Sequence, residues 1–213
     1  MDSGRRCVII AGGDPPDKFD ILDDDFIIAC DRGLLYAEDA GISPDVILGD
    51  FDSLGAEVPD RCEVLRYPEE KDDTDLMLAI KFSLSKGFRD FLLLGVYGGR
   101  MDHFIGNIQA AAYAASKGAV CHLSGKGEDA YVMSGGSMEI RNPGGRDFSM
   151  FSLSDRCTGI RLEGMKYKAD GITITNTFPI GVSNEFTEET ARVSLETGIL
   201  LIMLSVPQPK IRT

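Results

Sequence analysis

Short, fully apolar runs alternate with amphipathic segments over the first 125 residues. Continuous apolar runs are typical of parallel strands that are covered on both faces. Between some of these runs the apolar positions follow helical spacing: Leu76, Ile80 and Leu84 recur every four residues, and a second set extends from Phe104 to Ala115. The pattern predicts an open, mostly parallel α/β sheet flanked by helices, with strands at residues 7–11, 26–30, 46–48, 64–67, 91–96 and 120–123.

The pattern changes after residues 124–129. The rest of the chain holds short β-prone segments separated by glycine, proline and polar turns, with no sustained helical period. We therefore predict two domains, 1–125 and 126–213, the second an all-β sandwich or jelly-roll-like fold. Its expected strands are residues 130–133, 148–153, 159–162, 171–177, 191–195 and 199–206.

Charge separates the two predicted domains. The chain carries a formal net charge of −12, of which residues 1–125 contribute −11 and residues 126–213 only −1. This acidity argues against nucleic-acid partners, because such binding depends on lysine and arginine. An acidic domain that handles anionic substrates needs metal ions to mediate. The run of three aspartates at 23–25 is interpreted as a solvated surface.

Apolar runs and cysteines also indicate in which cellular compartment the protein is found. No apolar run approaches the ~20 residues of a membrane span, and the first residues have no apolar segment of signal-peptide length. The five cysteines are scattered and form no CxxC pair, which predicts neither a disulfide framework nor a thiolate zinc site. We expect a soluble, cytoplasmic protein without a membrane partner, its cysteines acting as small buried residues.

Carboxylates and glycines follow five of the predicted strands. Ligands of open α/β sheets bind outside the carboxyl ends of the strands, so these residues are expected to surround a site. Gly12 and Gly13 are predicted to let the backbone approach a ligand. Asp14 and Asp73 are interpreted as helix caps or turn formers. The five segments are 12–14, Asp31, 49–53, 70–75 and 98–103.

Asp50 and Asp52 are the sharpest signal. If the strand continues through them, residues two apart point the same way, so both carboxylates face one point and suit Mg²⁺. A D-x-D pair by itself is also found in glycosyltransferases, phosphatases and plain turns. Thr74 and Asp75 open the second helical segment. Asp75 is either a third ligand or only a favourable first-turn charge, while Thr74 is expected to cap the helix beside backbone N–H groups suited to phosphate.

The segment 98–103 adds a cationic hydrogen-bond donor to the carboxylates of the predicted site. Arg100 is a fork donor suited to phosphate oxygens, and Asp102 is expected to cap a helix that begins at His103. His103 is given a minor role, and His122 is interpreted as a core or edge residue. The sequence contains no P-loop, no dinucleotide fingerprint, no kinase motif and no nucleophile elbow, so phosphoryl chemistry here uses another scaffold.

Taken in order, four motifs resemble those of the thiamine pyrophosphokinase family, and the resemblance spans nearly the whole chain. It implies an N-terminal α/β domain, a C-terminal β-domain, a homodimer, and transfer of pyrophosphate from ATP to the hydroxyl of thiamine, leaving AMP. Lys71 makes the chain more similar to the bacterial type. The motifs are residues 49–53, 71–75, 98–103 with Asn107, and 181–185.

Several residue roles are implied only by this resemblance. Asp50, Asp52 and Asp75 would hold Mg²⁺, and Asp31, Asp72 and Asp102 would complete the acidic, nucleotide-facing site. Ser183 and Asn184 would bind thiamine across the dimer interface, with a Phe or Tyr stacking on it because the chain has no tryptophan. Gly12, Gly13, Arg32 and Thr74 would contact ATP. Arg32 departs from the glycine of many members and is expected to alter the phosphate contacts.

In the implied mechanism, Mg²⁺ bridges the ATP phosphates and leaves the β-phosphorus open to in-line attack. Lys71, Arg100 and Arg32 stabilise oxygen charge, and either Asp72 or Asp102 accepts the proton of the alcohol. Two other functions stay open at this point. A metal-dependent phosphoesterase usually has more than the two histidines present here, and a non-catalytic nucleotide or thiamine sensor has no need of a magnesium array.

Overall fold

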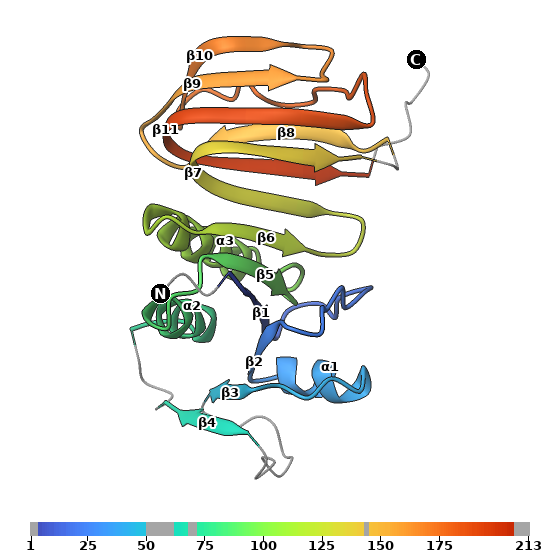
Figure 1. Ribbon diagram of the computed structural model, residues 1–213, viewed down its shortest axis with the longest axis vertical. Helices are drawn as coiled ribbons and strands as arrows, with labels where there is room; N and C mark the ends of the chain where they lie inside the picture. The colour runs from blue at the N-terminus through green and yellow to red at the C-terminus, as the bar shows by residue number, and fades with distance from the viewer. Residues whose placement is uncertain (1–3, 50–61, 68–71, 143–144, 207–213) are drawn as a thin grey trace. The chain divides into compact units, whose positions relative to one another are not determined.

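The computed structural model describes residues 4–49, 62–67, 72–142 and 145–206 (Figure 1). The chain divides into two compact units, Met1–Lys126 and Gly127–Thr213, here called unit 1 and unit 2. None of the helices in the described ranges is long and apolar enough to cross a membrane. The predicted fold class is confirmed, because unit 1 is α/β and unit 2 is β-rich.

Unit 1 is built on a parallel sheet with the strand order β6-β5-β1-β2-β3-β4. Every neighbouring pair in it runs in parallel. The predicted strands are present, and their bounds differ from the predicted ones by at most two residues at either end. They are β1 (Arg6–Ile10), β2 (Phe26–Cys30), β3 (Val46–Gly49), β4 (Glu63–Arg66), β5 (Asp90–Leu94) and β6 (Val120–Ser124).

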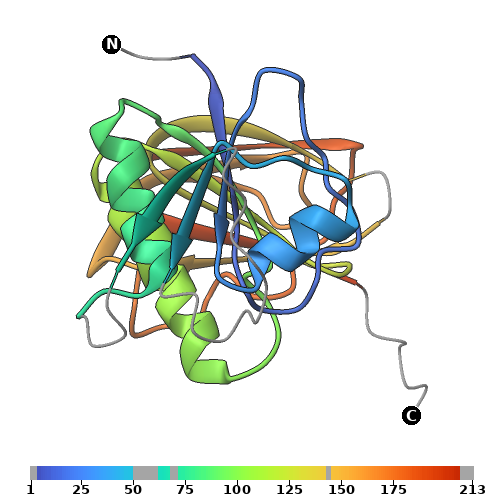
Figure 2. The ribbon, with the colours of Figure 1, turned by 90° about the horizontal axis from the view of Figure 1, so that it is seen from below.

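Helices cover both faces of this sheet. The helices α2 (Asp75–Ser85) and α3 (Met101–Ser116) lie on one face, and α1 (Gly33–Asp39) lies on the other (Figure 2). The sequence pattern predicted α2 and α3. It missed α1, because seven residues are too few to show a helical period.

The two faces of the sheet are both apolar, as the continuous strand runs require. Val8, Ile27 and Leu92 are register partners on the α1 side and belong to one buried cluster with Ala37 of α1. On the other face, the Cys7 thiol lies 3.3 Å from the Ser83 hydroxyl of α2. Cys7 is fully buried, and burial raises the pKa of its thiol to about 12, so it acts as a small apolar residue as expected.

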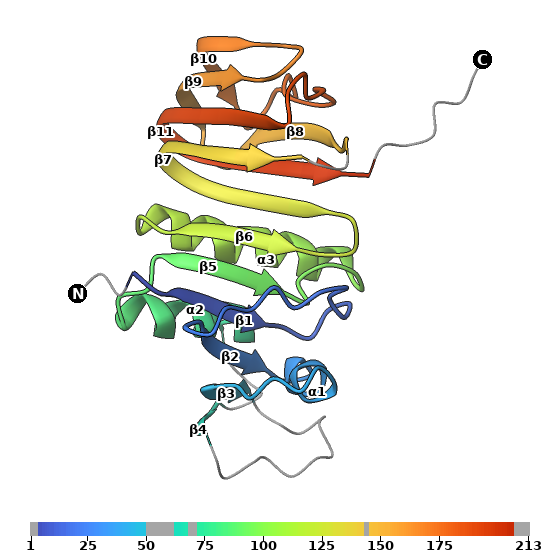
Figure 3. The same cartoon turned by 45° about the vertical axis from the view of Figure 1, so that its right-hand side comes forward.

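The strand order places a topological switch point between β1 and β5. The chain proceeds from β1 outward through β2, β3 and β4, and then returns to the opposite side of β1 with β5 and β6. The connections from β1 to β2 and from β5 to β6 therefore run in opposite directions along the sheet, and ligands of such sheets bind at the carboxyl edge near this point. Figure 3 shows β5, β1 and β2 side by side in this order.

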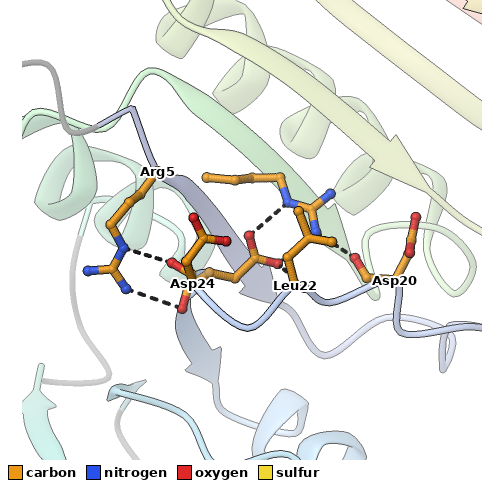
Figure 4. A network of polar contacts seen from close by, with 6 residues as sticks. Arg5, Asp20, Leu22 and Asp24 are labelled. Atoms are coloured by element: carbon orange, nitrogen blue, oxygen red, sulfur yellow. Dashed lines mark hydrogen bonds and ion pairs between the residues drawn. The ribbon is translucent and has the colours of Figure 1, made fainter.

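The interpretation of residues 23–25 as a solvated surface is wrong for Asp25. Its side chain is 1 % exposed and forms an ion pair with Arg6, with Nη2 2.6 Å from Oδ2 and Nε 3.0 Å from Oδ1. The Leu22 N–H donates to the same carboxylate at 2.8 Å. Figure 4 shows the surrounding network, in which Arg5 donates to the backbone carbonyl of Asp24. This pair joins the starts of β1 and β2, at the edge of the sheet opposite the carboxyl edge.

Unit 2 consists of antiparallel strands in the order β10-β9-β11-β7, with β8 also paired to β11. One edge of β11 pairs with β9 through Arg192–Thr197 and with β8 through Leu200–Ser205, so the strand takes part in two sets of strands. Its register shifts between Leu195 and Ile199. The strands are β7 (Asp129–Arg141), β8 (Asp147–Ser152), β9 (Arg156–Glu163), β10 (Ala169–Thr175) and β11 (Thr190–Ser205).

Two of the predicted boundaries in unit 2 are wrong. The strands expected at 191–195 and 199–206 are one strand, β11, because the residues between them form a bulge and not a turn. The strand expected at 130–133 continues through two glycines to Arg141. Glycine-containing bulges bend a strand without ending it, so the turn-like composition at both places was misleading.

Candidate functional site

A cavity of about 620 Å³ lies at the switch point of unit 1. It is bounded by the segments that follow β1, β2 and β5 and by the first turns of α2 and α3. These are the strand ends from which the sequence predicted a site. The lining residues are 11–13, 30–32, 74–76, 95–100, 102, 103, 106 and 107.

The cavity brings together most of the residues predicted for unit 1. Asp72 is exposed and does not line it. Asp50, Asp52 and Lys71 lie outside the described residues. The predicted residues that line the cavity are Gly12, Gly13, Asp31, Arg32, Thr74, Asp75, Arg100 and Asp102.

Asp31 occupies a strained backbone position at the end of β2. Its φ is +44°, in the left-handed region that residues with a side chain seldom adopt, and its N–H donates to the carbonyl of Leu48 in β3 at 3.1 Å. Its Oδ1 lies 1.8 Å from the point that a Cβ at Gly49 would occupy. The carboxylate of Asp31 therefore sits over Gly49, which ends β3 and is followed in the sequence by Asp50. Strain of this kind clusters at functional sites.

The glycine segments after β1 and β5 are in close contact. The Gly13 N–H donates to the Gly95 carbonyl at 2.7 Å, and the Asp14 N–H donates to the Tyr97 carbonyl at 2.8 Å. A Cβ at Gly13 would lie 2.5 Å from both carbonyl oxygens. Gly13 is thus required by the approach of the two segments, and its N–H is already engaged within the protein.

The start of α2 has the expected cap. Thr74 has an extended conformation, and its Oγ1 accepts a hydrogen bond from the Met77 N–H at 3.2 Å, which confirms the predicted capping role. Asp75 lies in the first helical turn and lines the cavity. The neighbouring Asp73 instead forms an ion pair with Lys81, with Nζ 2.6 Å from Oδ2. It is therefore neither a cap of this helix nor a wall of the cavity.

At the start of α3, Arg100 and Asp102 are paired with each other. Arg100 donates from Nε to Oδ1 of Asp102 at 3.1 Å and from Nη2 to Oδ2. Hydrogen bonding to Arg100 lowers the pKa of Asp102, and the His103 N–H contributes in the same direction. The predicted cap is wrong by two residues: α3 begins at Met101 after Arg100, and Asp102 lies inside its first turn.

Arg32 has a different environment from Arg100. It immediately precedes α1 and lines the cavity, yet no described residue forms a hydrogen bond or ion pair with its guanidinium. A cation without an internal partner beside a cavity is available to a ligand. Asn107, by contrast, donates from Nδ2 to the Val96 carbonyl at 2.8 Å and so holds α3 against the segment after β5.

The carboxylates suit a hard cation, but only part of the predicted ligand set is described. Asp31 and Asp75 line one cavity, and their oxygens are the donor type that Mg²⁺ prefers. Within the described ranges, no three histidine, cysteine or acidic side chains are close enough to hold a metal by themselves. Asp50 and Asp52, the strongest predicted ligands, are outside those ranges.

In unit 2, Ser183 and Asn184 differ in what they offer a ligand. Ser183 is exposed, with φ +61°. Asn184 is 7 % exposed: its Oδ1 accepts from the N–H groups of Tyr167 and Glu185 at 3.0 and 2.9 Å, and its Nδ2 donates to the Tyr167 carbonyl at 2.8 Å. Its amide therefore fixes the backbone of Tyr167.

Tyr167 is a candidate that the sequence reasoning missed. Its side chain is 62 % exposed, although Asn184 holds its backbone on both sides. Lys166 Nζ lies 5.6 Å from the ring centroid and 3.0 Å from the carboxylate of Glu185. The available signal was the need for an aromatic ring in a chain without tryptophan. Sequence alone could not show which aromatic residue has an exposed ring on a backbone that is held by hydrogen bonds.

Comparisons with known proteins agree with this geometry. Residues 21–122 match the family model "Thiamin pyrophosphokinase, catalytic domain", and residues 137–200 match "Thiamin pyrophosphokinase, vitamin B1 binding domain". Thiamine pyrophosphokinase of Bacillus subtilis (strain 168) is 31 % identical over 207 residues, which cover 92 % of this chain and 97 % of the relative.

Solved structures give the same result. The crystal structure of the Bacillus subtilis enzyme superimposes with a TM-score of 0.83 at 28 % identity and covers 96 % of this chain and all of that one. The enzyme from Geobacillus thermodenitrificans gives 0.80 at 25 % identity, with 95 % and 98 % coverage. With both domain models matched and a relative aligned along nearly its whole length, the chain belongs to the thiamine pyrophosphokinase family.

Proposed function

We propose that the cavity of unit 1 holds the triphosphate of ATP while this enzyme transfers pyrophosphate to the hydroxyl of thiamine. The products of that reaction are thiamine diphosphate and AMP. One observation carries the placement: the cavity at the switch point joins two glycine segments, the carboxylates of Asp31 and Asp75, and the guanidinium groups of Arg32 and Arg100. Glycines admit a phosphate chain, arginines bind its oxygens, and carboxylates hold its counter-ion.

Asp50, Asp52 and Asp75 are the proposed ligands of Mg²⁺. When bound, the ion would neutralise charge on the transferred group and help orient it. Asp31 supports this assignment, because its carboxylate lies over Gly49, the residue before Asp50. The first turn of α2 brings Asp75 to the same cavity, with Thr74 fixing the start of that helix.

The basic residues are proposed to share the phosphate oxygens. Arg32 can bind without giving up a contact to any described residue, whereas Arg100 is oriented by Asp102 and presents its remaining N–H groups. Lys71 completes the set by its place in the motif. Asp102 has a lowered pKa and an arginine partner, which makes it a poor proton acceptor. We therefore assign Asp102 to holding Arg100. Of the two proposed proton acceptors this leaves Asp72, which is exposed, does not line the cavity and must therefore approach it to act.

Unit 2 is proposed to bind thiamine through Ser183 and Tyr167. The exposed ring of Tyr167 offers a face to the cationic thiamine, since cations are attracted to aromatic faces. Asn184 takes part by holding Tyr167 in place. Asn184 therefore has a positioning role, and Ser183 and Tyr167 make the direct contacts with thiamine.

The active unit is proposed to be a homodimer in which thiamine is shared between chains. Phe178, Ile180 and Val182 precede Ser183 and are 66, 61 and 50 % exposed, an apolar stretch suited to cover by a second copy. The ATP site belongs to the α/β unit and the thiamine site to the β unit, so a shared substrate needs both.

We also assign the enzyme to the cytoplasm, where ATP is available and where its five cysteines, none in a disulfide, remain reduced.

One incubation separates this function from the two alternatives. The protein is mixed with ATP, MgCl₂ and thiamine, and the nucleotide and thiamine products are separated by chromatography. AMP and thiamine diphosphate in equal amounts are expected. Phosphate release that does not depend on thiamine would indicate a phosphoesterase, and tight binding without turnover would indicate a sensor.

A further inference from the structure

The hydroxyl of Tyr36, on α1, donates a hydrogen bond to the backbone carbonyl of Gly13 at 2.7 Å. Gly13 forms part of the cavity wall, whereas Tyr36 does not line that cavity. The ring of Tyr36 packs against the buried cluster that includes Val8 and Ile10. A single side chain thus reaches from the helix layer to the glycine segment after β1.

This bond completes the restraint of one peptide group. The carbonyl of Gly13 and the N–H of Asp14 belong to the same planar peptide. Tyr36 holds the carbonyl, and the Tyr97 carbonyl holds the N–H at 2.8 Å. Glycine itself imposes little preference on its dihedral angles, so the orientation of this peptide depends on these outside contacts.

Tyr36 also connects two walls of the cavity. The helix that carries Tyr36 begins directly after Asp31 and Arg32, which line the cavity from the end of β2. The Arg32 Cβ lies 3.2 Å from the position of a Cβ at Gly12. A displacement of the glycine segment would therefore change its spacing from the guanidinium of Arg32.

Tyr36 is only partly buried, so the hydrogen bond of its hydroxyl is an important restraint on the position of its side chain. Tyr36 also lines a second hollow of about 260 Å³, together with Pro15, Phe19 and Asp39. Side chains that border a hollow have fewer neighbours to hold them in one rotamer. The hydrogen bond to Gly13 is a specific restraint on this side chain.

We infer that Tyr36 is a positioning residue for ATP: its hydroxyl fixes the Gly13–Asp14 peptide and so sets the width of the cavity between the glycine segment and Arg32. This inference rests on the proposed placement of ATP. Tyr36 touches no reacting group, so its loss acts on ATP binding and not on the chemical step.

The test compares Tyr36→Phe with Tyr113→Phe. Tyr113 lies on α3, lines neither hollow, and its ring is near Lys81 and Lys117. Loss of one neutral hydrogen bond predicts that Tyr36→Phe raises the KM for ATP and the calorimetric Kd for ATP roughly three- to tenfold. The kcat and the KM for thiamine stay within about twofold of the wild type, as do all constants of Tyr113→Phe.

Thermal unfolding and circular dichroism establish that both variants fold. Tyr36→Met, which fills the apolar cluster without a hydroxyl, is the second variant and has the same expected effect on ATP. An unchanged KM for ATP in folded variants would overturn the inference, and so would a loss confined to kcat or an equal rise in both KM values. If the wild type makes no AMP and thiamine diphosphate, the proposed function fails instead.

Discussion

Replacing Asp25 by asparagine removes a buried charge far from the cavity and tests how unit 1 is held together. Asp25 is 1 % exposed and Arg6 is 19 % exposed, and they share two hydrogen bonds. Asparagine keeps the shape but leaves the Arg6 guanidinium facing a neutral amide. Breaking a buried pair costs about 3–5 kcal/mol, and the partial exposure of Arg6 reduces this to an expected loss of about 2–4 kcal/mol in the free energy of unfolding.

Asp24→Asn is the matched control. Asp24 is the adjacent residue in the same acidic run, its side chain is exposed, and only its backbone carbonyl accepts a hydrogen bond from Arg5. The same chemical change there should alter the free energy of unfolding by less than about 0.5 kcal/mol. Urea unfolding of the wild type and both variants measures the difference. Equal losses at the two positions would refute the distinction between a buried and a solvated aspartate.

The pH dependence gives a second readout with a defined sign. Burial by itself raises the pKa of Asp25, but hydrogen bonds from Arg6 and the Leu22 N–H outweigh it and lower the pKa below its ordinary value. A lowered folded-state pKa contributes stability above the unfolded value of about 3.9, and this contribution is lost as the pH falls through the folded pKa. The gap between wild type and Asp25→Asn should therefore be full at pH 7 and narrow below about pH 4.

Three further substitutions test the site. Thr74→Ala removes the cap of α2 and should lower the free energy of unfolding by about 1 kcal/mol, measured by urea titration; unchanged stability with abolished ATP binding would show that Thr74 is a ligand and not a cap. Gly13→Ala forces a Cβ against two carbonyl oxygens and should therefore raise the calorimetric Kd for ATP. An unchanged Kd would contradict the close approach of the two glycine segments. Mixing inactive Asp75→Asn with inactive Tyr167→Ala should restore about a quarter of wild-type activity if thiamine is shared between chains, and none after verified subunit exchange if it is not.

The strands and the position of the site could be predicted because the physics that sets them is local. Continuous apolar runs mark strands buried on both faces, and polar residues directly after such runs must lie at the carboxyl edge. Asp31 reaches the cavity for this reason, and Asp75 and Arg100 reach it because α2 and α3 begin at the same edge. The helix α1 escaped detection because it spans only two turns, and β11 was divided because a bulge and a turn use similar residues.

Pairing between distant side chains could not be predicted from the same patterns. Asp25 looks like its exposed neighbours in sequence, and only the fold brings Arg6 against it. Asn184 is expected to bind thiamine, and its sequence context does not show that its amide holds the backbone of Tyr167, 17 positions away. The lack of tryptophan indicated that a Phe or Tyr is needed, but not which one. Such contacts depend on tertiary structure, which neither periodicity nor composition records.

The most direct test of the site compares Asp75→Asn with Asp73→Asn. Asp75 lines the cavity, whereas Asp73 is paired with Lys81 and does not line it. Both variants are expected to fold, and thiamine diphosphate formation is measured at saturating Mg²⁺, ATP and thiamine. If the cavity is the site of pyrophosphate transfer, Asp75→Asn lowers kcat by roughly 100-fold or more and Asp73→Asn changes it by less than about threefold. Near-normal turnover by a folded Asp75→Asn variant would contradict the placement of the reaction in this cavity.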